Sequence, residues 1–301
     1  MASAVTQPDL GVVILNWNTR DLLRDCLRSV FASTGLTYRV CVVDNHSPDG
    51  SADMVAAEFP QAELIRNPVN NGYAAGNNLG LRALGFDHGR LDGPRYALLL
   101  NPDTVVPPDA LARMAAHLDA HLEAGIAGPR LVLPDGRLDL ACRRSFPTPE
   151  VAFYRLTGLS LLFPHSRLFG RYNLTYLDPG QETVVDSVVG AFMLVRREAI
   201  ARAGLLDENF FMYGEDLDWA LEIRKAGWNA RYFPDVTVLH VKRAASRRSS
   251  RAQIAFHEAM LYFYRKHYRG VTNPLLGGLV VVGIRANLWW TRLREAVLPR
   301  R

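Results

Sequence analysis

The 301-residue chain lacks the glycine-rich phosphate loops of two common nucleotide-binding folds. No Gly-x-Gly-x-x-Gly follows the first apolar run at Gly11–Leu15, and no Gly-Lys-Ser or Gly-Lys-Thr occurs anywhere in the chain. The first pattern is the dinucleotide-binding fingerprint, and the second cradles phosphates in P-loop enzymes. Their absence argues against a Rossmann dehydrogenase and against a P-loop nucleotidase.

Cysteine and long apolar runs are also scarce. The three cysteines, Cys26, Cys41 and Cys142, are odd in number and are not spaced as a metal knuckle. Cys26 and Cys41 lie among apolar residues and are expected to be buried thiols, which suits a reducing cytosol. Residues 1–10 show no apolar run behind a basic start, so no signal peptide is expected. No segment reaches the ~20 apolar residues of a membrane span.

The composition is that of a globular protein with a mild excess of positive charge. Hydrophobic residues make up 49% and charged residues 22% of the chain, and the formal net charge is +5. A chain of this length can bury one large core or two modest ones. The positive balance suits nucleoside diphosphates or anionic lipids as partners, and nucleic acid is not expected.

Apolar runs of strand length alternate with helical patterns in the first 122 residues. This alternation predicts a mostly parallel, doubly wound α/β sheet. The second half is less regular, and residues 146–177 cannot be assigned. There the patterns predict strands at 128–133, 184–195 and 236–240, and a long helix at 254–268. One domain with a C-terminal helical appendage is the simplest division.

An apolar run at 96–100 stops abruptly at Asn101-Pro102-Asp103. The proline ends ladder pairing and fixes a turn, so Asp103 is expected just past the carboxyl end of a buried strand. Ligands of open α/β sheets bind at that edge. The alternative is an Asx turn that merely caps the strand.

Three carboxylates, Glu215, Asp216 and Asp218, fall within four positions of an otherwise apolar and aromatic stretch. Buried charge is unfavourable unless it is paired, bound to metal or used in chemistry. A helix is expected to continue from this cluster to a stop at Gly227, which places the carboxylates at a loop-to-helix junction. The alternative is that the acids only favour the first turn of the helix through its dipole.

Polar turn residues also follow the first two expected strands. Asn16, Trp17 and Asn18 come after the first strand, and Asp44 comes after the second. With parallel neighbours these turns share one sheet edge with Asp103. Trp17 could then stack on a nucleobase, and Asp44 could accept the imide N–H of uracil or thymine. The alternatives are a packing aromatic and an ordinary turn residue.

The histidines and the basic stretch that follows the last expected strand are weaker signals. His240 ends that strand and would be read as a core histidine without the acidic motif upstream. His117 and His121, four residues apart, are interpreted as helix surface. Further candidates for binding a diphosphate, with a solvated loop as the alternative, are Lys242, Arg243, Arg247 and Arg248, and also Arg143 and Arg144.

The C-terminal segment mixes tryptophan with arginine. Residues 275–284 are apolar but too short to span a bilayer, and Trp289 and Trp290 are followed by Arg292 and Arg294. This composition suits a helix at a membrane interface. The alternative is a C-terminal helix packed on the domain with its tryptophans in the core.

Taken in order, the motifs resemble those of the family 2 inverting glycosyltransferases, and more narrowly a bacterial rhamnosyltransferase-like branch. The resemblance covers residues 11–268 and rests on Asn16-Trp17-Asn18, Asp44-Asn45, Asn71-Gly72 with Gly76-Asn77-Asn78, Asn101-Pro102-Asp103, Gly190-Ala191, Glu215-Asp216-x-Asp218 and His240. It implies a GT-A fold over residues 1–268. The nucleotide-binding half would span about 10–125 and the acceptor half about 126–268, with a helical segment at 269–301.

The resemblance also implies residue roles. Asp44 corresponds to the base-binding aspartate, and Trp17 stands where an aromatic ring flanks the nucleobase. Asp103 corresponds to the last residue of an Asp-x-Asp metal motif whose first aspartate is replaced here by Asn101, which leaves fewer charges around the metal. Asp216 corresponds to the catalytic base. The remaining implied roles are donor binding at Asn16, Asn18 and Asn77, metal binding at His240, and acceptor support at Gly190, Ala191, Glu215 and Asp218.

The implied reaction transfers a sugar with the help of a divalent cation, Mn²⁺ or Mg²⁺. The implied donor is dTDP-rhamnose, with UDP-sugars left open. The implied acceptor is a glycan or polyprenyl-diphosphate-linked hydroxyl in cell-surface polysaccharide synthesis at the cytoplasmic membrane face. A sugar nucleotidyltransferase, the rival enzyme class, would need a glycine-rich loop with a basic residue, and only Arg20 lies near the first strand. A catalytically dead binding module would lack the acidic cluster.

Overall fold

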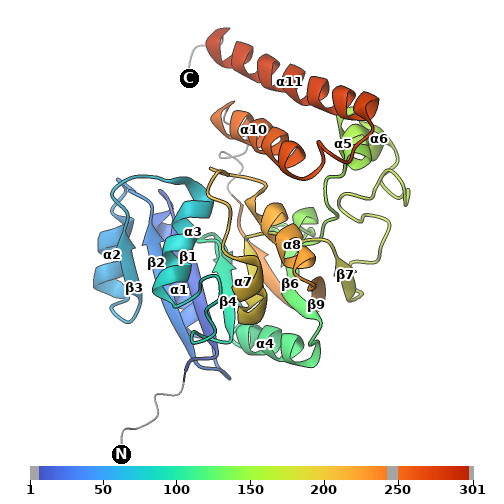
Figure 1. The fold of residues 1–301 in the computed structure, drawn as a ribbon. Coiled ribbons are helices and arrows are strands. Elements are labelled where there is room, and N and C mark those ends of the chain that lie inside the picture. The colour runs from blue at the N-terminus through green and yellow to red at the C-terminus, as the bar shows by residue number, and fades with distance from the viewer. Residues whose placement is uncertain (1–6, 243–249, 298–301) are drawn as a thin grey trace, which may run out of the picture.

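The computed structural model describes residues 7–242 and 250–297, and a mixed nine-stranded sheet forms its centre (Figure 1). The strands follow the order β3-β2-β1-β4-β8-β6-β9-β5, and β7 pairs with β9. Their bounds are β1 Leu10–Asn16, β2 Tyr38–Asp44, β3 Glu63–Arg66, β4 Tyr96–Leu100, β5 Thr104–Val105, β6 Ala124–Val132, β7 Thr183–Val185, β8 Phe192–Arg196 and β9 Asn229–His240.

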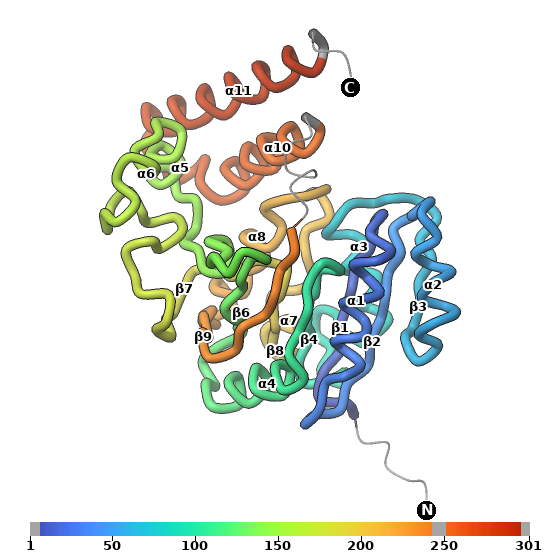
Figure 2. Tube along the Cα trace, turned by 180° about the vertical axis from the view of Figure 1, so that it is seen from behind, coloured from blue at the N-terminus to red at the C-terminus, as the bar shows by residue number. Residues whose placement is uncertain are grey.

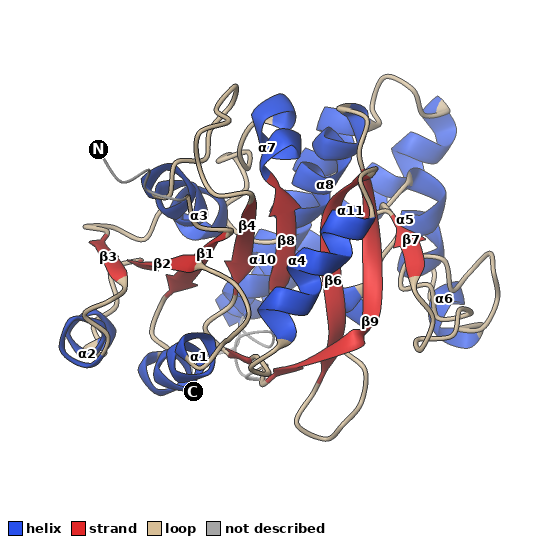
Figure 3. Ribbon diagram, turned by 90° about the horizontal axis from the view of Figure 1, so that it is seen from below, coloured by secondary structure: helices blue, strands red, loops and turns tan. Residues whose placement is uncertain are grey.

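The strands β1 to β4 form the predicted parallel, doubly wound unit. β1 pairs in parallel with both β2 and β4, and β2 pairs in parallel with β3. Figure 3 shows α1 and α2 on one face of this sheet and α3 on the other. The α-helices of the described residues are α1 Arg20–Phe31, α2 Ser51–Glu58, α3 Gly72–Ala83, α4 Ala110–Ala120, α5 Pro149–Leu156, α6 Leu159–Leu162, α7 Arg197–Ala203, α8 Glu215–Lys225, α10 Ser250–His267 and α11 Pro274–Val297.

The prediction of a single strand at 184–195 is wrong, because this stretch contains two separate strands. β7 and β8 are separated by a turn at 186–191, and β8 runs antiparallel between β4 and β6. The turn contains Gly190, where an added Cβ would lie 2.7 Å from the Tyr73 hydroxyl. The close approach of Tyr73 therefore explains why a glycine stands in the middle of an apolar run.

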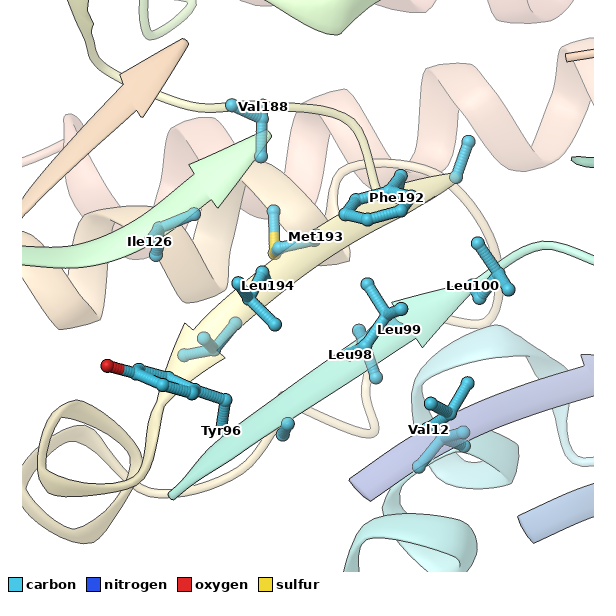
Figure 4. Packing of buried hydrophobic residues seen from close by; sticks show 14 of the residues in the cluster. Val12, Tyr96, Leu98, Leu99, Leu100, Ile126, Val188, Phe192, Met193 and Leu194 are labelled. Carbon is cyan, nitrogen blue, oxygen red and sulfur yellow. The ribbon is translucent and has the colours of Figure 1, made fainter. Parts of the chain in front are cut away.

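The core lies where β4 and β8 meet. Leu98, Leu99, Phe192 and Leu194 are buried there, and Figure 4 shows their side chains along the two neighbouring strands. The prediction of buried thiols is confirmed, since Cys26 and Cys41 are both fully buried and free. The continuous apolar character of these strands follows from their being covered on both faces.

The unassigned stretch contains two short helices. α5 begins after Thr148, whose side chain accepts a hydrogen bond from Val151 N–H, and Pro149 stands in its first turn. The helices α10 and α11 run side by side beyond the carboxyl ends of β1 and β4 (Figures 1 and 2). The helices α5 and α6 lie next to them. The C-terminal appendage is thus a helical layer above the sheet edge that was expected to bind ligand.

Candidate active site

The turns after β1 and β2 are joined by hydrogen bonds around Asp44. The side-chain amide of Asn16 donates to Asp44 Oδ1 at 2.8 Å, and Ser47 N–H donates to Oδ2 at 3.0 Å. Asp44 is only 4% exposed. Asn16 and Asp44 are direct register partners on parallel strands, so the sheet itself sets this contact.

Trp17 and Asn18 lie beside Asp44 and keep surface available. Trp17 is 51% exposed, which is unusual for a residue that would serve as core packing. Asn18 adopts a positive φ of 55° and has a buried Oδ1 that lacks a hydrogen-bond partner among the described residues. An exposed ring beside an unpaired acceptor is an arrangement that a nucleobase can occupy.

Asn77 supports the same edge from within α3. It is 1% exposed, and its amide donates to the Tyr73 carbonyl oxygen at 2.9 Å, one helical turn back. Asn45, which the motif analysis gave no role, donates to Asn70 and to the Gly72 carbonyl oxygen. The Asn45 contacts tie the turn after β2 to the start of α3. Asn77 fixes the backbone of the same helical turn through its bond to Tyr73.

Asp103 and His240 lie together at the next turn, as the motif order implies. His240 Nε2 is 3.3 Å from Asp103 Oδ1, and His240 Nδ1 is 2.9 Å from Asp139 Oδ2. The short β5–β9 pairing places Thr104 opposite His240 and so brings the two turns into register. Burial lowers the pKa of His240, but the hydrogen bonds to Asp103 and Asp139 outweigh it and leave the pKa above its ordinary value.

This donor set fits a divalent transition-metal ion. A carboxylate oxygen and an imidazole nitrogen converge, and a second carboxylate orients the other ring nitrogen, as is usual for metal-binding histidines. Imidazole with carboxylate suits Mn²⁺ better than Mg²⁺. Asp103 and His240 would hold the ion, and Asn101 contributes an uncharged side chain to the same turn.

Lys242 and its neighbours were candidates for binding the donor diphosphate. The Lys242 ammonium lies against Asp139 Oδ1. Burial opposes the charge of Asp139, but His240 and Lys242 together hold its pKa well below the usual value. In this structure Lys242 therefore belongs to the support of His240, whereas Arg243, Arg247 and Arg248 lie outside the described residues.

Asp216 is held by partners from two distant segments. Arg144 donates to its Oδ2 at 2.6 Å, and Gly190 N–H donates to the same oxygen at 3.1 Å. Leu217 N–H donates to Oδ1 at 2.8 Å. The interpretation of Arg144 as a diphosphate ligand is wrong, because its buried guanidinium is paired with Asp216. Arg143 likewise is buried and donates to the carbonyl oxygens of residues 177 and 178.

The Tyr73 hydroxyl connects the Asp103 turn to the Asp216 loop. It donates to the Gly190 carbonyl oxygen at 2.8 Å and lies 3.4 Å from Asn101 Oδ1. Ala191 accepts a hydrogen bond from Asn101 N–H at 3.0 Å. Burial first, and then the charges of Glu215, Asp216 and Asp103, raise the pKa of Tyr73 well above its ordinary value. The two acidic motifs, more than a hundred residues apart, therefore meet around one phenol.

Glu215 differs from its neighbour in having no such partners. It is 6% exposed, and its Oε2 has no hydrogen-bond partner among the described residues. Burial, together with the charge of Asp216, raises the pKa of Glu215 to about 8. The preceding residues Tyr213 and Gly214 both adopt positive φ angles, which turn the chain sharply into α8. Glu215 is therefore a buried carboxyl that holds its proton more tightly than a glutamate in water does.

Asp218 faces away from Asp216 toward α10. Its carboxylate lies 2.7 Å from His267 Nε2 and 2.9 Å from the Lys266 ammonium. Asp218 is 1% exposed, so the pairing explains how its charge is tolerated. Asp218 joins α8 to α10 and does not support the acceptor directly, which corrects the role implied for it.

His117 lies in the interior and not on the helix surface that its spacing from His121 suggested. Its side chain is buried and stacks on Phe233 with ring centroids 4.0 Å apart. His117, His121 and Glu182 could together hold a metal ion. The Glu182 carboxylate already pairs with the guanidinium of Arg231, however, so its negative charge is neutralised without a metal ion. The helix-surface interpretation of His117 is therefore wrong.

Four residues of this region carry no motif signal. Tyr73, Asp139, Lys266 and His267 all bond to groups that the motifs did identify, at separations of 28 to 117 residues in the chain. An unassigned aspartate or tyrosine next to an apolar stretch looks like any core-edge residue. The only sequence feature that indicated such partners was the cluster of carboxylates that includes Asp218, because buried charge needs a partner.

Comparisons with known proteins agree with this geometry. The family model described as glycosyl transferase family 2 matches residues 11–202. The chain is 28% identical over 258 residues, 85% of its length and 83% of theirs, to an N-acetylglucosaminyl-diphospho-decaprenol L-rhamnosyltransferase of Mycobacterium tuberculosis. It is 21% identical over 227 residues, 75% of this chain and 67% of the other, to the dTDP-rhamnosyl transferase RfbF of Shigella flexneri.

Solved structures show the same fold at lower identity. The mannosyltransferase PcManGT from Pyrobaculum calidifontis, in complex with GDP-Man and Mn²⁺, superposes with a TM-score of 0.58 at 17% identity, over 98% of this chain and 77% of that one. GalNAc-T7 with UDP, GalNAc and Mn²⁺ gives a TM-score of 0.58 at 13% identity, over 97% and 57% of the chains. The architecture is a GT-A fold, and the chain belongs to glycosyl transferase family 2.

Proposed function

We propose that the protein is a metal-dependent inverting glycosyltransferase that moves rhamnose from dTDP-rhamnose to a hydroxyl of a polyprenyl-diphosphate-linked glycan. The observation that carries the proposal is the meeting of the Asp103 and Asp216 turns around Tyr73. One turn suits a cation and the other suits an attacking alcohol. The rhamnose donor and the lipid-linked acceptor are taken from the relatives in Mycobacterium tuberculosis and Shigella flexneri.

Asp216 acts as the base in this proposal. The acceptor hydroxyl loses its proton as its oxygen attacks the anomeric carbon, and a carboxylate within hydrogen-bond reach can take that proton. Each carboxylate oxygen accepts two hydrogen bonds, and Leu217 N–H is the one donor to Oδ1 among the described residues. Arg144 and Gly190 fix the carboxylate from its other oxygen. A single displacement inverts the anomeric centre.

The other side of the site binds the donor. Trp17 would stack on the base, and Asp44 would accept its imide N–H. Asp103 and His240 would hold the divalent cation, which when bound neutralises the charge that develops on the diphosphate leaving group. Asp139 orients His240 for this role, and a UDP-sugar would bind by the same contacts.

The lipid-linked acceptor places the reaction at a membrane surface, on its cytoplasmic face. No helix among the described residues combines the length and apolar content needed to cross a bilayer. α11 instead has two apolar stripes. Val280, Ile284 and Leu288 are buried against the protein, and the opposite stripe is exposed, with Leu275 at 81%, Leu279 at 59%, Val282 at 65% and Trp289 at 63%.

This exposed stripe suits an interfacial helix. Arg285 and Arg294 are exposed on the flanks of the stripe, where their side chains can reach anionic headgroups, whereas Arg292 pairs with Glu258 of α10. A tryptophan at such a position is typical of a membrane interface. The protein would therefore lie on the membrane with α11 in the headgroup region, and the tryptophans are not core residues.

A panel of sugar nucleotides tests the proposed function. Purified protein is incubated with a short-chain lipid diphosphate glycan and dTDP-rhamnose, UDP-galactofuranose or UDP-N-acetylglucosamine, with and without Mn²⁺, and the released nucleoside diphosphate is measured. We expect release from dTDP-rhamnose that needs both acceptor and Mn²⁺. Release from a UDP-sugar alone would reassign the donor. Release of no nucleoside diphosphate from any donor would overturn the function.

A further inference from the structure

An apolar pocket of about 270 Å³ lies between α5, α10 and α11, apart from the turns that bind the donor. Its walls include Ala152 of α5, Met260 and Phe263 of α10, and Val280 and Ile284 of α11. The volume is near the lower end of the range for small-ligand pockets, about 300–1,000 Å³. Among the described residues, those that line the pocket include no carboxylate, which suits an apolar group attached to an anion.

The pocket borders the loop that carries the catalytic carboxylates. The ring of Phe256, which also lines the pocket, lies 6.0 Å from the Tyr213 ring, centroid to centroid. The Met260 methyl carbon is 3.4 Å from the point where a Cβ would lie on Gly214. Asp216 follows Gly214 by two residues. A molecule in the pocket therefore lies next to the turn that positions Asp216.

The same pocket also borders the membrane-facing helix. Val280 and Ile284 lie on the inner stripe of α11, while Leu279 and Val282 lie on its exposed stripe. Figure 2 shows α11 as the outermost element, with α10 between it and the sheet. A lipid whose chain leaves the bilayer at α11 and whose head reaches Asp216 must pass this position.

Positive charge is available at the pocket wall. Arg155 lines the pocket, and its guanidinium carbon lies 4.1 Å from the centre of the Tyr172 ring, which also lines it. This cation–π contact holds the arginine in place while leaving its N–H groups able to bind an anion. A diphosphate at Arg155 would connect an apolar chain in the pocket to a sugar near Asp216.

We propose that this pocket binds the first isoprenoid units of the acceptor lipid and that Arg155 contacts its diphosphate. The inference rests on the proposed function for the class of acceptor. It adds a recognition site for the lipid that is separate from the donor site and from the exposed stripe of α11. The aromatic and methionine side chains of α10 suit a methyl-branched chain, since methionine adapts to irregular shapes.

The test measures binding of farnesyl diphosphate to the full chain by calorimetry, with inorganic pyrophosphate as the head-only comparison. We expect farnesyl diphosphate to bind more tightly than pyrophosphate. Ala152→Phe places a ring in the pocket and should weaken farnesyl diphosphate binding at least tenfold, with pyrophosphate binding unchanged. Ala152→Leu, a smaller change, should weaken it less, and it serves if the phenylalanine variant fails to fold.

The matched control is Thr157→Phe, which adds the same ring at the exposed end of α5. It should bind farnesyl diphosphate as the wild type does. Equal affinity of the wild type for the two probes, unchanged affinity in both folded Ala152 variants, or equal weakening in Thr157→Phe would overturn the inference. Because this assay needs no turnover, a protein that binds farnesyl diphosphate but transfers no sugar fails the proposed function and keeps the lipid site.

Discussion

The turns proposed to bind the donor (the donor side) and the carboxylates proposed to face the acceptor (the acceptor side) are built in different ways. On the donor side, Asn16 and Asp44 contact each other because they are register partners on neighbouring parallel strands. On the acceptor side, Asp216 takes its partner Arg144 from 72 residues away, and Asp218 takes His267 from 49 residues away. The first arrangement follows from the sheet alone, whereas the second exists only when the C-terminal half has folded around it.

This difference implies that the two sides can be disturbed separately. A substitution among the acceptor-side carboxylates should change transfer or stability and leave nucleotide binding intact. A substitution around Asp103 should change the metal requirement and leave the α8–α10 contact intact.

Asp216→Asn removes the proposed base and should lower the transfer rate by about 10²- to 10⁴-fold. Nucleotide affinity, measured by calorimetry, should stay near the wild-type value because Asp44 and Trp17 are untouched. Glu215→Gln is the matched variant one position earlier and should retain more activity. Wild-type rates in Asp216→Asn would refute the base assignment, and a parallel loss of nucleotide affinity would end the separation of the two sides.

Asp139→Asn weakens the support of His240 and should reduce Mn²⁺ affinity by about 10- to 100-fold, as loss of such outer carboxylates usually does. The measurement is the Mn²⁺ concentration that gives half-maximal transfer, together with direct Mn²⁺ binding. Asp135→Asn, in the exposed turn four residues earlier, is the control and should leave the metal requirement unchanged. Equal Mn²⁺ affinity in the two variants would remove Asp139 from the site.

Asp218→Asn breaks the ion pair to Lys266 and weakens the hydrogen bond to His267, and it should lower the free energy of unfolding by about 1–3 kcal/mol. The measurement is denaturant unfolding, with nucleotide binding as a second readout that should not move. Glu222→Gln, one turn further along α8, serves as the control because its contact with Lys225 is partly exposed and its oxygen lies 3.9 Å from His267 Nδ1, beyond hydrogen-bond distance. A change in nucleotide affinity in Asp218→Asn would show that the α8–α10 contact reaches the donor side.

Glu215→Gln should remove a pH dependence of stability. The pKa of Glu215 is raised to about 8 in the folded protein, so between its ordinary value of 4.5 and 8 the folded state binds its proton more tightly than the unfolded chain does. Stability therefore falls as pH rises through this window. The wild-type melting temperature should decrease from pH 5 to pH 8 by more than that of Glu215→Gln. Identical slopes would contradict the assignment.

Leu279→Glu places a charge on the exposed stripe of α11 and should lower co-sedimentation with anionic vesicles several-fold. Transfer to a water-soluble, short-chain acceptor should be unchanged. Leu122→Glu is the control, because Leu122 is 73% exposed and follows α4, which lies at the opposite end of the molecule from α11 (Figure 1). Equal vesicle binding in the two variants would show that α11 is not the membrane-contacting face.

Much of the donor side could be predicted from the sequence. The alternation of apolar runs with helical spacing placed β1, β2 and β4, and the polar turns that follow them were expected at one edge, where the structure has them. These features are readable because each depends on a short stretch of chain and on the parallel pairing of neighbours.

The acceptor side could be predicted only in part. The carboxylate cluster indicated that partners must exist, but neither Arg144 nor His267 could be identified as those partners. Arg144 was interpreted as an anion ligand, because a basic residue beside a proline-rich loop looks the same whether its partner is a phosphate or a buried aspartate. The interruption between β7 and β8 at Gly190 could not be predicted either, because Tyr73, which approaches this glycine closely, belongs to a helix distant in the sequence.

The phenol ring of Tyr73 has a mechanical consequence. Its hydroxyl lies between Gly190 and Asn101, and its backbone N–H donates to the Phe211 carbonyl oxygen. An aromatic ring cannot stretch, so it acts as a rigid spacer that sets the separation between the Asn101–Asp103 turn and the Gly190 loop that holds Asp216.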